Sequence, residues 1–231
     1  MTGKSRSKST KSTKSKSSRR WLDRQHSDYY TQLAREKGYR SRSAYKLLEI
    51  QEKDKIIFKG MRVVDLGAAP GGWSQVLVNH VGSSGKIVAI DILPIESLKG
   101  VDTVYGDFQK TETLEELMLI LDGKSVDLVI SDLAPNLSGI AVADQARVMD
   151  LAEMALDFAE RVLVKEGVFL IKVFQGSGFQ EYLMHLKKKF QRVCVRKPKA
   201  SRAESREVYL LATGYHPYSK ETQGVCLERH A

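Results

Sequence analysis

One segment constrains the fold more than any other, namely residues 63–73 with the sequence VVDLGAAPGGW. Its β-branched residues, acid and leucine predict a buried strand, and the glycines that follow predict a tight turn. From Trp73 onward, apolar residues recur at helical spacing, at Val76, Leu77 and Val81. A strand, a glycine loop and a helix in this order open a nucleotide-binding α/β unit, in which the ligand lies beyond the carboxyl end of the strand.

The glycine loop, residues 67–72, limits which cofactor this unit can hold. Its spacing is not the G-x-G-x-x-G of a dinucleotide site, which argues against a nicotinamide-dependent dehydrogenase. Pro70 also lacks the N–H group that the start of a phosphate-binding helix would donate. A cofactor without phosphate fits this loop better, and we expect S-adenosylmethionine. A simple turn between strand and helix, with no ligand, is the alternative interpretation.

The positive charge is concentrated at the start of the chain. The net charge is +9, and eight of the 37 Lys and Arg residues lie in residues 1–20, which hold no acid. The other 29 basic residues nearly balance the 28 acidic ones. Residues 1–20 are rich in Ser, Thr and Lys with no apolar residue after Met1, so we expect a disordered tail that attracts nucleic acid. The segment lacks the apolar core of a signal peptide.

The composition gives no indication of a membrane segment or a metal site. No apolar run approaches the ~18 residues of a membrane span. Cys194 and Cys226 are the only cysteines, which is typical of a reducing cytoplasm. The five histidines have no ligand spacing, so we expect no structural metal.

Strand-like and helix-like segments alternate along the chain, which predicts a mostly parallel sheet with helices on both faces. Thr113 and Glu116 have the spacing of a capping box at the start of one helix. The expected strands are residues 63–66, 85–91, 101–105, 126–132, 167–174, 193–196 and 208–212. The expected helices are residues 28–37, a helix capped by Ser41 or Ser43 and running to residue 50, and residues 73–81, 113–121, 148–162 and 179–190.

Four aspartates, Asp65, Asp91, Asp107 and Asp132, lie at or just after the ends of expected strands. Because parallel strands end at one edge of a sheet, these carboxylates could share one rim. Asp91 follows the second strand, where a carboxylate in this architecture accepts hydrogen bonds from ribose hydroxyls. A magnesium site is the alternative use of such a rim.

Lys172 interrupts the otherwise apolar strand of residues 168–174. An unpaired charge inside a buried strand is costly. We therefore expect a buried lysine opposite an acid such as Asp132. A lysine at the exposed end of the strand, extending into solvent, is the alternative.

Two loops are rich in basic residues. One, residues 37–42, lies between two expected helices, and the other, residues 197–206, lies between the last two expected strands. The first combines Arg40 and Arg42 with Tyr39, and such residues can hold phosphate and stack on a base. A solvated connection between two helices is the alternative for this loop.

Taken together, five motifs resemble the FtsJ/RlmE family, which are S-adenosylmethionine-dependent methyltransferases of the ribose 2′-hydroxyl of a uridine in 23S ribosomal RNA. The motifs extend over most of residues 20–214, and several of them together are highly specific. They are RSRSAYKL at 40–47, VDLGAAPGGWS at 64–74, SDLAPN at 131–136, KVFQG at 172–176 and SRAESREVY at 201–209.

The resemblance implies a Rossmann-like fold with a seven-stranded sheet and one antiparallel strand. It places the family's catalytic set on Lys46, Asp132, Lys172 and Glu207. It further implies a cofactor site that includes Gly71, Trp73, Asp91, Asp107 and Asp132.

The same resemblance divides the chain into a domain and two tails. We expect a disordered basic tail at 1–20, a single methyltransferase domain at 21–214 and a C-terminal tail at 215–231. Within the domain, residues 21–58 would form a helical part that contacts RNA. The expected partner is 23S rRNA in the large ribosomal subunit or its precursor, bound by a cytoplasmic monomer.

Two alternatives to this function are a related 2′-O-methyltransferase acting on tRNA or an mRNA cap, and a ribosome assembly factor without activity. The presence of all four catalytic-type residues argues against the second. A DNA amino-methyltransferase would carry an aromatic residue after a Pro-Pro pair, and residues 132–136 have neither.

Overall fold

The computed structural model describes residues 29–136, 138–202 and 205–217. The basic tail, most of the C-terminal tail and the expected start of the first helix at residue 28 lie outside these ranges. Residues 29–36 are helical. The strands are β1 (Arg62–Leu66), β2 (Lys86–Asp91), β3 (Val101–Tyr105), β4 (Val126–Ser131), β5 (Leu163–Phe174), β6 (Phe190–Arg196) and β7 (Glu207–Tyr215). The later helices are α2 (Ala44–Asp54), α3 (Gly72–Val81), α4 (Thr111–Leu121), α5 (Ala141–Val162) and α6 (Phe179–Lys189).

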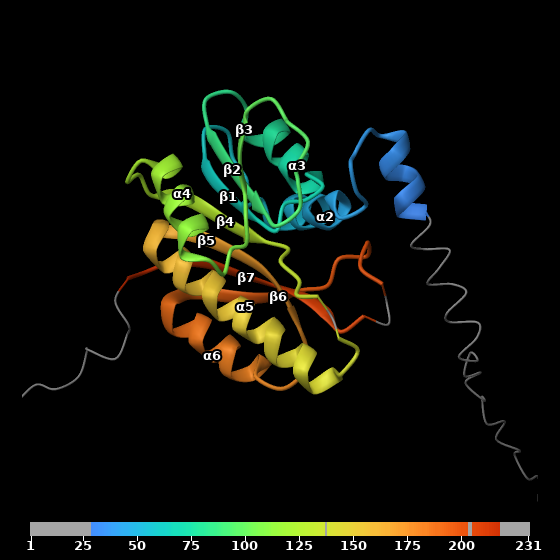
Figure 1. The fold of residues 1–231 in the computed structure, drawn as a ribbon, viewed down its shortest axis with the longest axis vertical. Helices are drawn as coiled ribbons and strands as arrows, with labels where there is room; N and C mark the ends of the chain where they lie inside the picture. Colours follow the sequence, from blue (N-terminus) through green and yellow to red (C-terminus); the bar gives the residue numbers. More distant parts are fainter. Residues whose placement is uncertain (1–28, 137, 203–204, 218–231) are drawn as a thin grey trace, which may run out of the picture.

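The seven strands form one sheet in the order β3-β2-β1-β4-β5-β7-β6 (Figure 1). β7 pairs antiparallel with both β5 and β6, and all other neighbours are parallel. This confirms the predicted fold class and the single antiparallel strand. The chain runs from β1 outward to β2 and β3 and then returns to β4 on the other side of β1, so the strand order reverses between β1 and β4. The crevice expected for a ligand therefore lies beyond the carboxyl ends of these two strands. In open α/β sheets this is where ligands bind.

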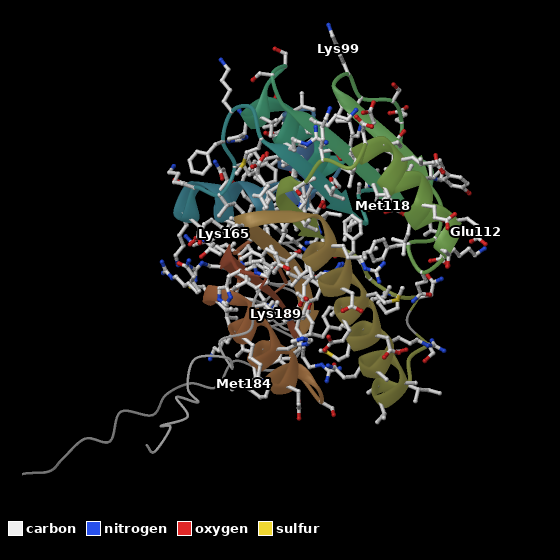
Figure 2. All side chains as sticks on the ribbon, turned by 90° about the vertical axis from the view of Figure 1, so that its left-hand side faces the viewer. Lys99, Glu112, Met118, Lys165, Met184 and Lys189 are labelled. Atoms are coloured by element: carbon white, nitrogen blue, oxygen red, sulfur yellow. The ribbon has the colours of Figure 1, made fainter. Side chains whose placement is uncertain are left out.

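Helices cover both faces of the sheet (Figure 1), as predicted. Buried residues of α4, α5 and α6 pack on one face, and those of α2 and α3 pack on the other. The central strands are apolar along most of their length because both of their faces are covered. Figure 2 views the molecule from the side; there Lys189 marks the end of α6, and its ammonium group pairs with Glu160 of α5 at 2.8 Å.

Several element boundaries differ from the predictions. The capping box is wrong: α4 begins at Thr111, and its N-cap residue Lys110 makes no side-chain cap. Thr113 is therefore inside the helix, where a Cβ on Gly106 would meet its side chain. Ser43 is the N-cap of α2 but makes no cap hydrogen bond, because its hydroxyl pairs with that of Ser41.

α5 begins at Ala141, seven positions before Val148, the first residue of the apolar stripe that predicted this helix. Asp144 stabilises this early start, since its carboxylate accepts the N–H groups of Ser138 and Gly139 at 2.7 and 2.9 Å. β5 also begins early, at Leu163, and its register against β4 shifts between Val126 and Leu128. None of the helices in the described ranges is long and apolar enough to cross a bilayer.

Candidate functional site

The glycine loop after β1 lies against the backbone that follows β4. Gly67 has a φ of +76°, and a Cβ there would come within 2.8 Å of the Leu133 backbone nitrogen. The N–H groups of Gly67 and Ala68 donate to the Ile90 carbonyl at the end of β2, at 2.9 and 3.1 Å. A side chain at Gly67 would push the two segments apart, so glycine is required at this close approach.

Asp91, at the end of β2, holds the glycine loop in place. Its Oδ2 accepts the Ala69 N–H at 2.9 Å, and its Oδ1 accepts the Leu93 N–H at 2.8 Å. Each carboxylate oxygen has a second acceptor site, which suits the ribose hydroxyls expected there. The neighbouring Ile92 and Leu93 are 58% and 61% exposed, which offers apolar surface to a planar ring.

Arg40 links the glycine loop to the segment at residues 96–97. Its guanidinium donates to the carbonyls of Pro70, Glu96 and Ser97 at 3.3, 2.8 and 3.1 Å. A Cβ on Gly71, which has a φ of +106°, would meet the same guanidinium at 2.7 Å. Arg40 was expected to contact RNA, but its donors serve the glycine loop and the 96–97 segment.

Of the other predicted cofactor residues, Trp73 has a buried side chain and Asp107 lies at the edge of the sheet. The Trp73 side chain is only 2% exposed, and its Nε1 donates to the Ser43 carbonyl at 2.8 Å. A cofactor can therefore reach only the backbone of Trp73. Asp107 lies two residues after β3, and its Oδ1 accepts the Gln109 N–H at 3.0 Å. It lies at the same edge of the sheet as Asp91.

Asp132 and Lys172 form a largely buried ion pair beside the crevice. The Lys172 Nζ lies 3.1 Å from Oδ1 of Asp132 and donates to the Asp132 carbonyl at 2.6 Å. The Lys172 side chain is 10% exposed, so the structure supports the buried lysine and not the solvent-exposed one. The Asp132 backbone N–H donates to the Leu66 carbonyl, which ties the pair to the end of β1.

Lys46 and Glu207 form a second pair on the same face. The Lys46 Nζ lies 2.7 Å from Oε1 of Glu207, which also accepts the Ser201 hydroxyl at 2.9 Å. Burial alone would raise the pKa of Glu207, but the charge and hydrogen bond of Lys46, together with the charge of Lys172, lower it. Glu207 is therefore a carboxylate that holds the Lys46 ammonium in position.

The register between β5 and β7 brings the two pairs together. Lys172 lies opposite Tyr209, and Phe174 lies opposite Glu207. Side chains at alternate positions share a face, so Lys172, Tyr209 and Glu207 point toward the α2 side of the sheet. Lys46 extends from α2 to within 5.6 Å of the centre of the Tyr209 ring. The structure thus unites all four predicted catalytic residues.

Tyr209 is the central residue that the sequence analysis did not single out. It is fully buried, and its hydroxyl donates to Oδ1 of Asp132 at 2.8 Å. Burial, followed by the negative charges of Asp132 and Glu207, raises the pKa of Tyr209 well above its ordinary value, so its hydroxyl stays protonated and can donate to Asp132. It belongs to the motif at residues 201–209, but its role depends on a contact that only the fold reveals.

Asp65 is not on the rim with the other aspartates. It is fully buried beneath α3, where the Ser74 hydroxyl donates to its Oδ2 at 2.7 Å. Burial raises its pKa to about 7, although the Ser74 hydrogen bond opposes this, and the charges of Asp132 and Asp91 raise it further. Within the described residues, no group of three or more His, Cys, Asp or Glu could hold a metal ion.

Comparison with known proteins gives concordant matches. The model of the FtsJ-like methyltransferase family matches residues 39–215. Ribosomal RNA large subunit methyltransferase E of Alkalilimnicola ehrlichii is 58% identical over 198 residues, which cover 86% of this chain and 95% of that protein. The protein of the same name from Cellvibrio japonicus is 52% identical over 202 residues, or 87% and 96% of the two chains.

Solved structures share the fold. A crystal structure described as a ribosomal RNA methyltransferase from Plasmodium falciparum has a TM-score of 0.69 and 29% identity, covering 77% of this chain and 98% of that one. Aeropyrum pernix fibrillarin with bound S-adenosyl-L-methionine has a TM-score of 0.50 and 16% identity, covering 74% and 76%. The fibrillarin likeness concerns the fold alone.

The raised pKa of Asp65 predicts a pH-dependent stability. An acid whose folded pKa of about 7 exceeds its ordinary 3.8 destabilises the fold progressively as pH rises between these values, by roughly 4 kcal/mol in the limit. Asp65→Asn removes this penalty. Urea unfolding without cofactor should therefore show the variant gaining stability relative to wild type between pH 5 and pH 8. Asp102→Asn, on the exposed β3, is the control, and an equal pH response of the two variants would refute the assignment.

The hydrogen bonds of Asp91 predict its effect on cofactor affinity. Asp91→Ala should weaken S-adenosylmethionine binding by about tenfold or more, because the glycine loop loses its hydrogen bond at Ala69, the segment after β2 loses the one at Leu93, and the ribose loses its acceptor. Isothermal titration calorimetry on the folded variant measures this directly. Asp102→Ala serves as the matched control, and an Asp91→Ala variant with wild-type affinity would contradict the site.

Proposed function

The chain belongs to the FtsJ-like methyltransferase family, and we propose that it methylates the ribose 2′-hydroxyl of a uridine in 23S ribosomal RNA with S-adenosylmethionine as methyl donor. The observation that carries this proposal is the convergence of Lys46–Glu207 and Asp132–Lys172 on one face, next to the glycine loop. Two relatives above 50% identity, both named as large subunit ribosomal RNA methyltransferases, support the substrate.

The glycine loop and the rim acids fit the cofactor. Asp91 anchors the glycine loop through the Ala69 N–H, and Asp91 and Asp107 would offer polar acceptors to the ribose and the base of the adenosine. S-adenosylmethionine supplies a methyl group on a sulfonium, which is transferred in one in-line displacement. For such a step, alignment of the acceptor oxygen accounts for much of the rate.

The two lysines would act on the acceptor hydroxyl. A ribose 2′-hydroxyl is a weak acid, so a base that removes its proton as the new bond forms increases the rate. Lys172 is the best placed group, because it lies at the strand end beside Asp132 and the crevice. Asp132, Glu207 and Tyr209 hold the two lysines in position, and Lys46 offers a positive charge to the developing oxyanion.

The proposed setting of the reaction follows from the substrate. The enzyme would act in the cytoplasm, as a monomer, on the large ribosomal subunit or its precursor. The basic tail at residues 1–20, which lies outside the described residues, would add salt-dependent attraction to RNA through its eight positive charges.

Nucleoside analysis tests the proposed function. The protein is incubated with methyl-labelled S-adenosylmethionine and with large subunits from cells that lack the enzyme, and the labelled nucleoside is identified by mass spectrometry. We expect 2′-O-methyluridine in 23S rRNA. Label on a base, on transfer RNA alone, or on no RNA would overturn the proposal.

Substitution of Lys172 tests its role. Lys172→Ala should lower the single-turnover methylation rate by ~10²-fold or more, because it removes the base. Lys172→Arg should be almost as slow, since a guanidinium stays protonated. Lys165→Ala is the matched control: Lys165 lies on the same strand but is exposed at its other end (Figure 2).

Cofactor affinity should be unchanged in all three lysine variants, which shows that they are folded. A Lys172→Arg variant with a near-normal rate would mean that only the charge matters, and Lys172 would then not be the base.

A further inference from the structure

A groove with a volume of about 630 Å³ lies between the helix of residues 29–36 and α2. Three tyrosines, Tyr29, Tyr30 and Tyr45, and two leucines, Leu33 and Leu48, form its apolar lining. None of the residues assigned above to the cofactor or to the reaction lines it. The volume is within the range of roughly 300–1,000 Å³ that is typical of ligand sites, so the groove can accept one or two large side chains.

The aromatic lining is held in place by contacts among its own residues. The centre of the Tyr30 ring lies 5.3 Å from that of Tyr29 and 5.5 Å from that of Tyr45. The Tyr45 hydroxyl donates to the Leu33 carbonyl at 3.2 Å, which joins α2 to the first helix. Tyr29 is nevertheless 58% exposed. An exposed apolar patch with a polar rim is typical of an interaction surface.

The rim of the groove carries both signs of charge. Glu49 and Glu52 contribute carboxylates, and Lys53 and Lys199 contribute ammonium groups. Glu49 also accepts the backbone N–H groups of Lys199 and Ala200 at 2.6 and 3.0 Å, so one wall of the groove is fixed to the loop that precedes β7. A peptide with large apolar side chains between charges of both signs fits such a groove.

Residues 19–24, with the sequence RRWLDR, have this character and lie outside the described residues. Trp21 and Leu22 are the only apolar residues between Met1 and Tyr29. Trp21 is eight positions before Tyr29, so at ~3.3 Å per residue the connection spans up to roughly 26 Å, which is ample to turn back onto a groove that Tyr29 itself lines.

We propose that Trp21 and Leu22 insert into this groove, with the flanking arginines and Asp23 paired to the charges of its rim. An arginine beside a tyrosine ring gains a cation–π contact in addition to its ion pair. The contact would fix the point at which the basic residues 1–18 leave the domain. That point lies beside the loop whose Ser201 donates to Glu207, so the tail would begin next to the catalytic face.

Limited proteolysis of the full-length protein tests this docking. Trypsin cleaves after Arg24, next to the segment, and after Lys16, which serves as the internal reference. The variants are Trp21→Ala in the segment, Leu48→Ala in the groove, and the two combined. Phe58→Ala is the matched control, because Phe58 is an apolar side chain outside the groove that is 57% exposed. The cleavage rates are measured by mass spectrometry of the fragments.

We expect cleavage after Arg24 in the wild type and in Phe58→Ala to be at least about tenfold slower than after Lys16, which corresponds to roughly 1.4 kcal/mol of docking. The protease acts on the undocked form, so Trp21→Ala and Leu48→Ala should each lose this protection. The combined variant should cleave no faster than either single variant, because both remove one contact.

A second readout on the intact protein uses 5-fluorotryptophan, which labels Trp21 and Trp73. The ¹⁹F resonance of Trp21 is assigned by its absence in Trp21→Phe. It should shift in Leu48→Ala and stay unchanged in Phe58→Ala, which separates loss of the groove contact from a general effect of substitution.

Three results would overturn the docking. The first is equal cleavage after Arg24 in the wild type, Trp21→Ala and Leu48→Ala, with an unchanged Trp21 resonance. The second is protection that increases with protein concentration, which would assign the groove to a second copy of the chain. The third is a Leu48→Ala variant that binds a 23S rRNA transcript more weakly while its cleavage is unchanged, which would assign the groove to RNA.

Discussion

The rest of the site depends on the set of hydrogen bonds around Asp132. Its N–H holds the end of β1, its carbonyl accepts Lys172, and its carboxylate accepts the Tyr209 hydroxyl while facing the same lysine. Removing charges from water is costly unless each one is paired and hydrogen-bonded. Because this one residue bonds to β1, β5 and β7, it joins the end of β1, from which the glycine loop leaves, to the proposed catalytic residues.

The antiparallel strand β7 makes the arrangement possible. Its pairing with β5 sets Tyr209 beside Lys172 and Glu207 beside Phe174, so that alternation along the strand points both polar residues of β7 toward α2. A shift of one residue would turn both side chains to the opposite face, where α5 and α6 pack. The second basic loop leads into this strand, which is why Ser201 lies beside Glu207.

The sequence allowed the sheet to be predicted, and it allowed four residues to be singled out that the fold brings together, but it did not show which contacts support them. Apolar runs identified the strands, and a charge inside one of them identified Lys172 and its partner. Tyr209 was missed because its role depends on a contact between segments far apart in the chain. The start of α5 was missed because Asp144 stabilises it through the loop before the helix, where apolar spacing carries no signal.

The central claim is that Lys172 removes the proton of the acceptor hydroxyl and that Asp132 holds its side chain in position. The most direct test is the single-turnover methylation rate of the wild type and of Asp132→Asn, measured from pH 6 to pH 10 at saturating cofactor. The account predicts a wild-type rate that rises with pH, because only a neutral amine accepts a proton, and a much lower rate in Asp132→Asn across this range. A wild-type rate independent of pH, or an Asp132→Asn variant as fast as the wild type, would contradict it.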